Sequence, residues 1–347
     1  AYGGGSLKRT GLYDRIVAML GEAGKTVTDF GGIMPNPTLK KVQEGQLLAR
    51  ETKADLILAV GGGSVSDCCK IVASPPAPLQ SERGVDTHAI PLGVVVTASG
   101  TGSEQNNGAV ITDEEKKVKG AMWGVFADFA ILDPDLTKTV PMKQVISGAF
   151  DTLSHCMETY FGHPHTCNLS DRINEAVQRS VIKNLKAIIA RSAQGDACLS
   201  KNPDDDFARS ELMWASAMGE NGILKLGKVT DFQCHMIEHQ LGAYTDCNHG
   251  QGLAVLHPVV YRHIYKCAEE KFRRWAQEVW LVQDADEGID FLADFIREAG
   301  LPTTFSDMGI TLDDATIRAI ADSTIITPGC CKQLTPDEIV EILNECK

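Results

Sequence analysis

The sequence predicts an α/β domain over residues 1–141, followed by an all-α domain over residues 142–347. Three observations lead to this fold class. In the first part, short apolar runs rich in β-branched residues alternate with stretches of helical periodicity, which is typical of a parallel sheet covered by helices. Glycine-rich loops follow two of the expected strands. After Met142 the periodicity is helical and β-branched runs become sparse.

In the first domain, glycine and proline mark the ends of the expected elements. Gly31-Gly32 and the segment 35–37 separate the early elements, and the triple glycine 61–63 ends a buried apolar run. Asp133-Pro134 closes the last strand. The predicted elements are helices at 12–20, 38–51 and 65–73, strands at 25–30, 55–60, 90–97 and 129–132, and a hairpin made of 109–112 and 117–121.

The second domain is predicted to consist of helices. Thr335, Pro336 and Glu338 form a strong helix start, because a threonine cap and a glutamate three residues later satisfy free N–H groups and proline fits the first turn. The other helices are expected at 211–219, 232–242, 253–265, 272–282 and 289–299.

Composition argues against several classes of protein and partner. Hydrophobic residues make up 43% of the 347 residues and charged residues 23%, which is typical of a globular protein and not of a disordered one. No apolar run is long enough to span a bilayer and no signal-peptide pattern opens the chain, so we expect no membrane partner. The formal net charge of -13, without a Lys/Arg cluster, argues against a nucleic-acid partner.

The cysteines and the start of the chain carry two further expectations. None of the 11 cysteines forms a C-x-x-C pair, which predicts free, mostly buried thiols in a cytoplasmic protein. The chain opens with the glycine loop 3–5, and no strand precedes it. Because such loops normally follow a strand, we expect native residues to precede Ala1.

Two glycine-rich loops predict a dinucleotide site in the first domain. Gly61, Gly62, Gly63 and Ser64 stand between an expected strand and an expected helix, where glycine lets the backbone approach a phosphate at a helix N-terminus. A second loop, 97–104, follows the next strand. Because ligands of open α/β sheets lie at the carboxyl ends of the strands, the two loops together favour one extended ligand.

The opening loop indicates which dinucleotide binds. It reads Gly3-Gly4-Gly5 and then Ser6, with Lys8 close behind. A hydroxyl and a cation suit a phosphate, whereas an acidic residue would be expected for the ribose diol of NAD. The sequence therefore predicts that NADP(H) is preferred over NAD(H).

Five residues of the second domain include the candidate ligands of a metal site. Asp151 and His155 stand four residues apart and share one helix face, as do His235 and His239, and His249 follows. Either pair alone is a weak signal. One carboxylate and three imidazoles in apolar helical sequence indicate a divalent cation, since buried groups of this kind need a partner. Such a set suits one Fe(II) or Zn(II) ion, with Mn(II) or Co(II) as alternatives.

The chain resembles the iron-containing (group III) alcohol dehydrogenases over essentially its whole length. Four motifs agree with that family in order and spacing: G-G-G-S-x-x-D-x-x-K at 61–70, T-A-S-G-T-G-S-E at 97–104, G-A-F-D-T-L-S-H at 148–155, and H-M-I-E-H-Q-L-G with N-H-G at 235–250. The opening loop resembles the NADPH-dependent butanol dehydrogenase branch. The resemblance implies a dinucleotide-binding domain, a helical metal-binding domain, a site in the cleft between them, and a homodimer.

The resemblance also implies residue roles. It implies that Asp151, His155, His235 and His249 are the metal ligands and that His239 lies near nicotinamide and substrate, where it would pass a proton. The residues implied or predicted to bind the cofactor are Gly4, Gly5, Ser6, Lys8, Gly61, Gly62, Gly63, Ser64, Asp67, Thr97, Thr101 and Lys119.

The expected reaction is reversible hydride transfer between NADP(H) and a small aldehyde or primary alcohol, such as butanal and butanol. Two other functions stay open at this point. One is a sugar-phosphate cyclase of the dehydroquinate synthase type, whose architecture is related. It would need basic residues near the metal, and the metal-site segments are poor in them. The other is a non-catalytic assembly protein.

Overall fold

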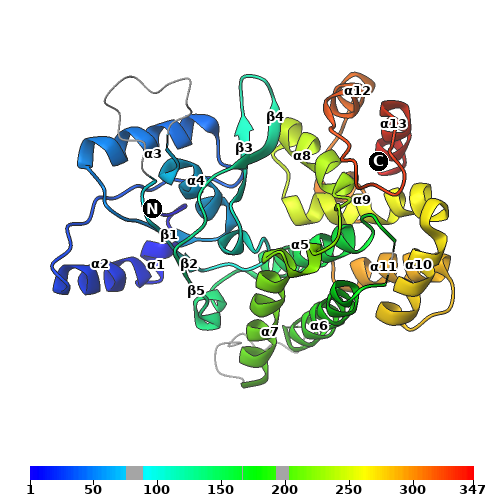
Figure 1. Cartoon of the computed structure of the whole chain (residues 1–347), viewed down its shortest axis with the longest axis horizontal. Coiled ribbons are helices and arrows are strands. Elements are labelled where there is room, and N and C mark those ends of the chain that lie inside the picture. Colours follow the sequence, from blue (N-terminus) through cyan, green and yellow to red (C-terminus); the bar gives the residue numbers. More distant parts are fainter. Residues whose placement is uncertain (76–88, 166, 193–202) are drawn as a thin grey trace. The chain divides into compact units, whose positions relative to one another are not determined.

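The computed structural model describes residues 1–75, 89–165, 167–192 and 203–347. The chain divides into two compact units (Figure 1). The first unit contains Ala1–Ala98 and Ser103–Val140, and the second contains Ser99–Gly102 and Pro141–Lys347. The short loop Ser99–Gly102 therefore packs with the helical unit, although it lies within the α/β part of the sequence.

A three-stranded parallel sheet forms the centre of the first unit. Its strands are β1 (Ile57–Gly61), β2 (Leu92–Val96) and β5 (Phe129–Ile131), in the order β1-β2-β5. Every residue of β2 is buried, as expected for the central strand of a parallel sheet. The predicted strands at 55–60, 90–97 and 129–132 are confirmed.

Helices α1 to α4 and a hairpin complete this unit. Thr38 caps α3 by accepting a hydrogen bond from Lys41 N–H (3.2 Å). The predicted helices and the antiparallel hairpin are confirmed. Their bounds are α1 (Ser6–Arg9), α2 (Leu12–Glu22), α3 (Leu39–Thr52), α4 (Gly63–Ala73), β3 (Gly108–Asp113) and β4 (Val118–Trp123).

The segment 25–30 is not a strand, contrary to the prediction. Phe30 accepts a backbone hydrogen bond from Tyr2 N–H (2.9 Å), and Tyr2 forms a single bridge with Val60. A β-ladder needs repeated backbone pairs with one partner. Because the chain leaves Tyr2 through the glycine loop 3–5 and enters α1, the segment meets that partner at one residue only.

The second unit is helical, as predicted. The expected helix at 272–282 is divided, because α10 ends at Trp275 and continues as the π-helical turn η7 (Ala276–Trp280). The helices are α5 (Met142–Tyr160), α6 (Leu169–Ser192), α7 (Pro203–Glu220), α8 (Gln233–Thr245), α9 (His249–Ile264), α10 (Glu269–Trp275), α11 (Ala285–Glu298), α12 (Asp314–Ser323) and α13 (Pro336–Glu345).

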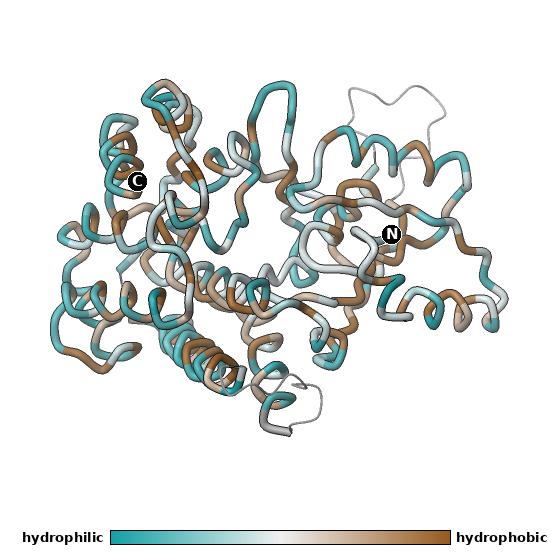
Figure 2. The backbone as a smooth tube through the Cα atoms, turned by 180° about the vertical axis from the view of Figure 1, so that it is seen from behind, coloured by the Kyte–Doolittle hydropathy of each residue, from teal (hydrophilic) through white to brown (hydrophobic). Residues whose placement is uncertain are grey.

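Helix α5 is the central element of this unit. Every residue from 149 to 160 is buried, so the helix is covered on all its faces. Helices α6, α7 and α9 pack against it. Hydrophobic and hydrophilic stretches alternate along the helices of this unit (Figure 2), which is typical of amphipathic helices around a common core. The expected capping box at Thr335 and Glu338 is present at the start of α13.

The loop Ser99–Gly102 is held by α5 and α7. The N–H groups of Gly100 and Gly102 both donate to Ser216 Oγ (3.0 Å each), and Thr152 Oγ1 donates to Gly100 O (2.9 Å). A Cβ at Gly148 would lie 2.4 Å from Ser99 O, so the loop passes directly over α5. Gly100 and Gly102 of the motif at 97–104 therefore allow the loop to pack against α5 and α7. The sequence alone did not reveal this role.

A buried ion cluster joins three segments of the second unit. Asp171 of α6 forms ion pairs with Lys228 Nζ (2.9 Å) and Lys271 Nζ (2.7 Å), and all three side chains are buried. Lys271 Nζ also lies 3.8 Å from the centroid of the Tyr160 ring. Burial lowers the pKa of Lys271 to about 8. One carboxylate thus compensates two buried ammonium groups.

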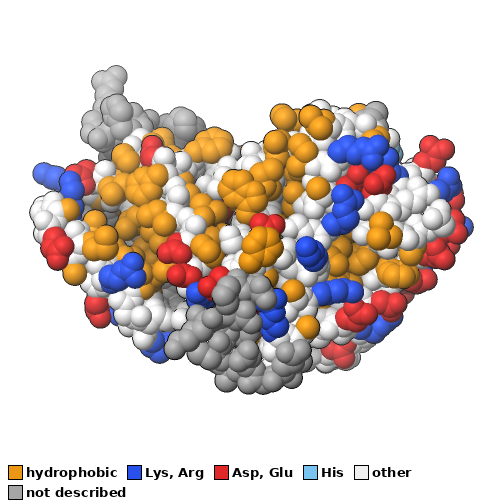
Figure 3. All heavy atoms as spheres, turned by 90° about the horizontal axis from the view of Figure 1, so that it is seen from below, with side chains coloured by type: hydrophobic (Ala, Val, Ile, Leu, Met, Phe, Trp, Pro, Cys, Tyr) orange, Lys and Arg blue, Asp and Glu red, His pale blue; other side chains and the backbone are white. Residues whose placement is uncertain are grey.

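The surface mixes apolar and charged side chains. The face in Figure 3 shows hydrophobic side chains interspersed with acidic and basic ones. Phe129 and Ile131 of β5 are among the exposed large apolar residues. Scattered apolar residues are normal on protein surfaces. In the described ranges, none of the helices combines the length and the apolar character that a membrane span requires.

Candidate functional site

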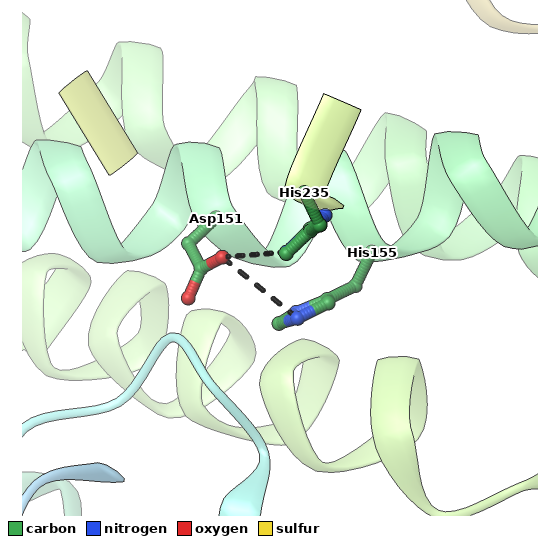
Figure 4. A group of neighbouring side chains, drawn as sticks. All are labelled: Asp151, His155 and His235. Carbon is green, nitrogen blue, oxygen red and sulfur yellow. Dashed lines mark ion pairs between the residues drawn. The ribbon is translucent and has the colours of Figure 1, made fainter. Parts of the chain in front are cut away.

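Two helices bring a carboxylate and two imidazoles together. Asp151 and His155 lie one turn apart on α5, and His235 lies in the first turn of α8. Figure 4 shows both imidazole rings turned toward the carboxylate of Asp151. The rings of His155 and His235 stack at 4.6 Å between centroids with an interplanar angle of 20°. The predicted face shared by Asp151 and His155 therefore exists and points at His235.

His249 reaches the same carboxylate from the start of α9. Asn248 caps that helix by accepting from Gln251 N–H (3.2 Å), which fixes the position of His249. Gly250 permits the close approach of α9 to α5, because a Cβ there would lie 2.2 Å from Ser147 O. The side chain of His249 is 25% exposed, so the cluster is reached by solvent on this side.

The geometry of these four residues fits a divalent metal ion. Asp151 Oδ1 lies 3.8 Å from His155 Nε2, 3.5 Å from His235 Nε2 and 3.4 Å from His249 Nε2. These distances exceed the range of about 2.7–3.2 Å for N–H···O hydrogen bonds. Within the described residues, Asp151 Oδ1 and His235 Nε2 have no hydrogen-bond partner. Donor atoms about 2.1 Å from a tetrahedral ion stand about 3.4 Å apart.

Burial and mutual charge determine the protonation of the cluster. Burial alone would raise the pKa of Asp151, but His155 and His249 hold the pKa of its carboxyl well below its usual range. Burial lowers the pKa of His155. Burial opposes the charge on His235 as well, yet Glu158 and Asp151 raise its pKa to about 10. A metal ion would therefore displace a proton from His235 on binding.

The sequence analysis missed two glutamates behind the histidines. Glu158 Oε2 contacts His235 Nδ1, and Glu238 Oε2 contacts His249 Nδ1. Glu158 follows Asp151 by two turns of α5, and Glu238 lies within the H-M-I-E-H segment. Spacing could have placed both carboxylates near the ligands, but it does not say which histidine each one meets.

His239 lies beside the group around Asp151. It is buried, and its ring stacks on that of His249 at 5.6 Å between centroids. One potential ligand atom of His239 lies within 4.8 Å of those of Glu238 and His249. Asp151 forms a second set of this kind with His155 and His235.

The loop between β1 and α4 leaves space for a ligand beside Gly62. Gly62 caps α4, and in the described part of the chain no side chain caps this helix, which leaves N–H groups for an anion. A Cβ at Gly62 would meet Ala98 at 3.4 Å, an ordinary contact. A Cβ at Gly61 would lie 2.5 Å from Val65 Cγ2. Helix packing therefore requires Gly61, whereas Gly62 leaves room for a phosphate.

The opening glycine loop leads into α1. A Cβ at Gly4 would meet no atom within 4 Å, and one at Gly5 would lie 3.1 Å from Arg9 Nη1. Ser6 is exposed at the start of α1. Lys8 Nζ lies 3.6 Å from Asp29 Oδ2. The loop itself is therefore open to a ligand, while the predicted cation already has an acidic neighbour.

Asp29 is an acidic residue near the opening loop that the sequence analysis missed. Its carboxylate accepts from Tyr13 Oη (2.8 and 2.9 Å) and Tyr2 Oη (3.1 Å). Burial would raise the pKa of Asp29, but the hydrogen bonds from these tyrosines and the charge of Lys8 lower it. Asp29 follows the glycines of the opening loop at a distance in sequence similar to that of the acidic residue that binds the ribose in dinucleotide-binding folds. This spacing is the sequence signal by which Asp29 could have been found.

The other expected cofactor residues lie in different settings. Asp67 accepts from Ser103 Oγ (2.5 Å) and Val110 N–H (2.8 Å), so it joins α4 to the hairpin. Lys119 is buried on β4. Within the first unit, Gly63 and Ser64 begin α4 and Thr97 follows β2, whereas Thr101 belongs to the second unit.

Two family models match the chain. The model described as iron-containing alcohol dehydrogenase matches residues 1–134. The model of the C-terminal part of the Fe-containing alcohol dehydrogenase family matches residues 145–346. Together they cover nearly the whole sequence, one in each part.

Individual relatives agree with these models. The NADH-dependent butanol dehydrogenase B of Clostridium acetobutylicum is 35% identical, over 99% of this chain and 89% of the relative. The NADPH-dependent aldehyde reductase YqhD of Escherichia coli is 34% identical, over 92% of this chain and 83% of the relative. The crystal structure of NADH-dependent butanol dehydrogenase A from Thermotoga maritima superimposes with a TM-score of 0.87 at 30% identity, over 99% and 89% of the two chains.

Proposed function

Because the chain belongs to the iron-containing alcohol dehydrogenase family, we propose that it reduces small aldehydes such as butanal with NADP(H) at a divalent metal held by Asp151, His155, His235 and His249. The observation that supports the site is the convergence of three Nε2 atoms on the buried Asp151 Oδ1. As an oxidoreductase of this family, the protein acts on alcohols and aldehydes.

The protein's own residues would hold and orient the reactants. When bound, the divalent ion, Fe(II) or Zn(II), would supply Lewis acidity toward the carbonyl group, and the nicotinamide would supply hydride. The four ligands come from three helices that pack together, which fixes their relative positions. Solvent reaches the cluster at His249, so the aldehyde would approach on that side.

His239 is proposed as the residue that passes a proton between the product oxygen and solvent. It is buried beside His249, and it is not part of the set formed by Asp151, His155 and His235. We expect His239→Ala to retain its metal and to lose about 100-fold or more in kcat, since general acid–base catalysis contributes about 10²–10⁴-fold. Metal content and steady-state rates check this. Loss of the metal in His239→Ala would reassign His239 as a ligand.

The preference for NADP(H) is proposed from the opening loop. Asp29, the acid that could bind a ribose diol, is engaged by Lys8 and two tyrosine hydroxyls, so its acceptor positions are largely occupied. Ser6 remains exposed at the start of α1. The relatives are divided, since their names include both NADH-dependent and NADPH-dependent enzymes.

The test is anaerobic oxidation of NADPH with butanal, using metal-stripped protein to which Fe(II) or Zn(II) is added back. We expect metal-dependent turnover with kcat/KM for NADPH about tenfold or more above that for NADH. Tenfold corresponds to about 1.4 kcal/mol, the scale of a single charged hydrogen bond to the phosphate. A preference for NADH would overturn the cofactor assignment alone. No metal-dependent turnover with any aldehyde of a panel would overturn the proposed reaction.

A further inference from the structure

Glu238 has a well-defined environment on one side of the metal cluster. Its Oε2 contacts His249 Nδ1, and its Oε1 lies 3.7 Å from Cys247 Sγ. The side chain is fully buried. A carboxylate can only accept, so His249 Nδ1 carries a hydrogen, and in the neutral ring His249 Nε2 then keeps its lone pair. That lone pair is the one on the side of Asp151.

Glu158 occupies the equivalent position behind His235. Its Oε2 contacts His235 Nδ1, so Nδ1 carries a hydrogen and Nε2 is the nitrogen left to bind a metal once its proton is displaced. Its Oε1 accepts from Cys234 N–H (2.6 Å) and His235 N–H (3.3 Å), so the carboxylate also caps the N-terminus of α8. Glu158 therefore fixes both the backbone and the ring of His235.

The third histidine is held differently. His155 Nδ1 has no hydrogen-bond partner in the described part of the chain. The ring packs against two others, since it stacks on His235 and lies 5.8 Å from the Phe232 ring centroid. Its position follows from the helix it shares with Asp151 and from ring packing, whereas a carboxylate determines the tautomer of His235 and His249.

We propose that Glu158 and Glu238 are positioning residues for the metal, each holding Nδ1 of one histidine so that Nε2 faces Asp151. This inference rests on the metal site proposed above. Together with Asp151, the two glutamates place buried carboxylates around the site. A buried group of carboxylates is stabilised by a divalent cation, so removing either glutamate weakens metal binding through both orientation and charge.

The test compares alanine and glutamine at both positions. Zn(II) affinity is measured on metal-stripped protein by competition with a chelator. We expect Glu238→Ala and Glu158→Ala to bind Zn(II) about 10–100-fold more weakly than wild type, the usual effect of losing such a partner. Glutamine keeps an oxygen that accepts from Nδ1–H, so Glu238→Gln and Glu158→Gln should recover part of the loss. The absorption spectrum of bound Co(II), which reports ligand orientation, should change in the alanine variants.

A matched control separates this effect from general loss of packing. Glu175 is equally buried, but it accepts from Tyr160 Oη (2.8 Å) and Arg274 Nε (2.8 Å) and touches none of the proposed ligands. We expect Glu175→Gln to lower the unfolding midpoint of the metal-stripped protein and to leave Zn(II) affinity and the Co(II) spectrum unchanged.

A steric variant tests Glu238 without altering it. A Cβ at Gly252 would lie 2.9 Å from Glu238 Cγ and 3.3 Å from its Oε1, so Gly252→Ala must displace the carboxylate. We expect Gly252→Ala to weaken Zn(II) binding as Glu238→Ala does. At Gly219 of α7, a Cβ would meet Cys156 Sγ at an ordinary 3.6 Å, so Gly219→Ala should bind Zn(II) as wild type does.

The outcomes distinguish this inference from the proposed function. Wild-type Zn(II) affinity in both alanine variants, beside a tightly binding wild type, would overturn the positioning role alone. If the wild type itself binds neither Zn(II) nor Co(II), the proposed metal site fails and this inference fails with it. Because Glu158 also caps α8, Glu158→Ala could fail to fold, and Glu158→Gln together with the Glu238 variants then decides the question.

Discussion

Replacing His249 with alanine is expected to remove the metal and the dehydrogenase activity together. His249 Nε2 is one of three imidazole nitrogens around Asp151 Oδ1, and Asn248 and Gly250 fix its position. Lewis-acid catalysis contributes several kcal/mol to stabilisation of the transition state. At about 1.4 kcal/mol per tenfold in rate, its loss lowers kcat/KM about 1000-fold or more. Metal content after gel filtration and steady-state kinetics with butanal measure both effects.

A second histidine provides the control for this experiment. His263 lies toward the end of α9, where its Nε2 is 3.0 Å from Glu345 Oε1. His263→Ala removes an imidazole from the same helix, and we expect it to keep metal and activity. Stoichiometric metal in His249→Ala would show that His249 is not a ligand. The remaining set would then be Asp151, His155 and His235, with His239 as the next candidate.

Replacing Asp171 with asparagine is expected to lower the free energy of unfolding by about 3–5 kcal/mol, because removing one partner of a buried ion pair leaves an uncompensated buried charge. Asparagine keeps the size of the side chain. The ammonium groups of Lys228 and Lys271, 2.9 and 2.7 Å from the carboxylate, would then repel each other in a buried site. For a helical unit of this size, the loss corresponds to roughly 10 °C in the unfolding midpoint.

Thermal unfolding followed by circular dichroism measures this change, with the metal removed from all samples so that binding does not contribute. The matched control is the surface pair of Lys186 and Glu298, whose side chains are 51% and 61% exposed. We expect Glu298→Gln to leave the midpoint unchanged, since solvent already screens this pair. Equal midpoints for Asp171→Asn and wild type would mean that the buried cluster does not stabilise the unit.

Local signals in the sequence were sufficient for much of the fold. Helical periodicity predicted α3, α8 and α9, and the capping box at Thr335 predicted the start of α13. These features depend on neighbours within four residues, so the sequence contains them directly. The strand expected at 25–30 failed for the opposite reason, because a strand exists only where a partner runs beside it.

In the candidate metal site, too, local sequence patterns predicted some features and only the tertiary structure showed the others. Spacing placed Asp151 and His155 on one face of α5 and indicated which residue types could bind a metal. Only the tertiary structure brought His235 and His249 within 3.5 Å of the same carboxylate oxygen. Periodicity identifies the buried face of a helix, but it does not identify the helix that packs there.

The sequence by itself determined the fold class, most of the elements and the candidate metal ligands, because each follows from local pattern or from motifs in a fixed order. The tertiary structure alone decided that Glu158 supports His235 and Glu238 supports His249, that Asp29 accompanies Lys8, and that Asp171 compensates two lysines. Most of these contacts join residues that are far apart in the chain. They depend on burial and on which oxygen faces which nitrogen, and the spacing of residues in a sequence contains neither.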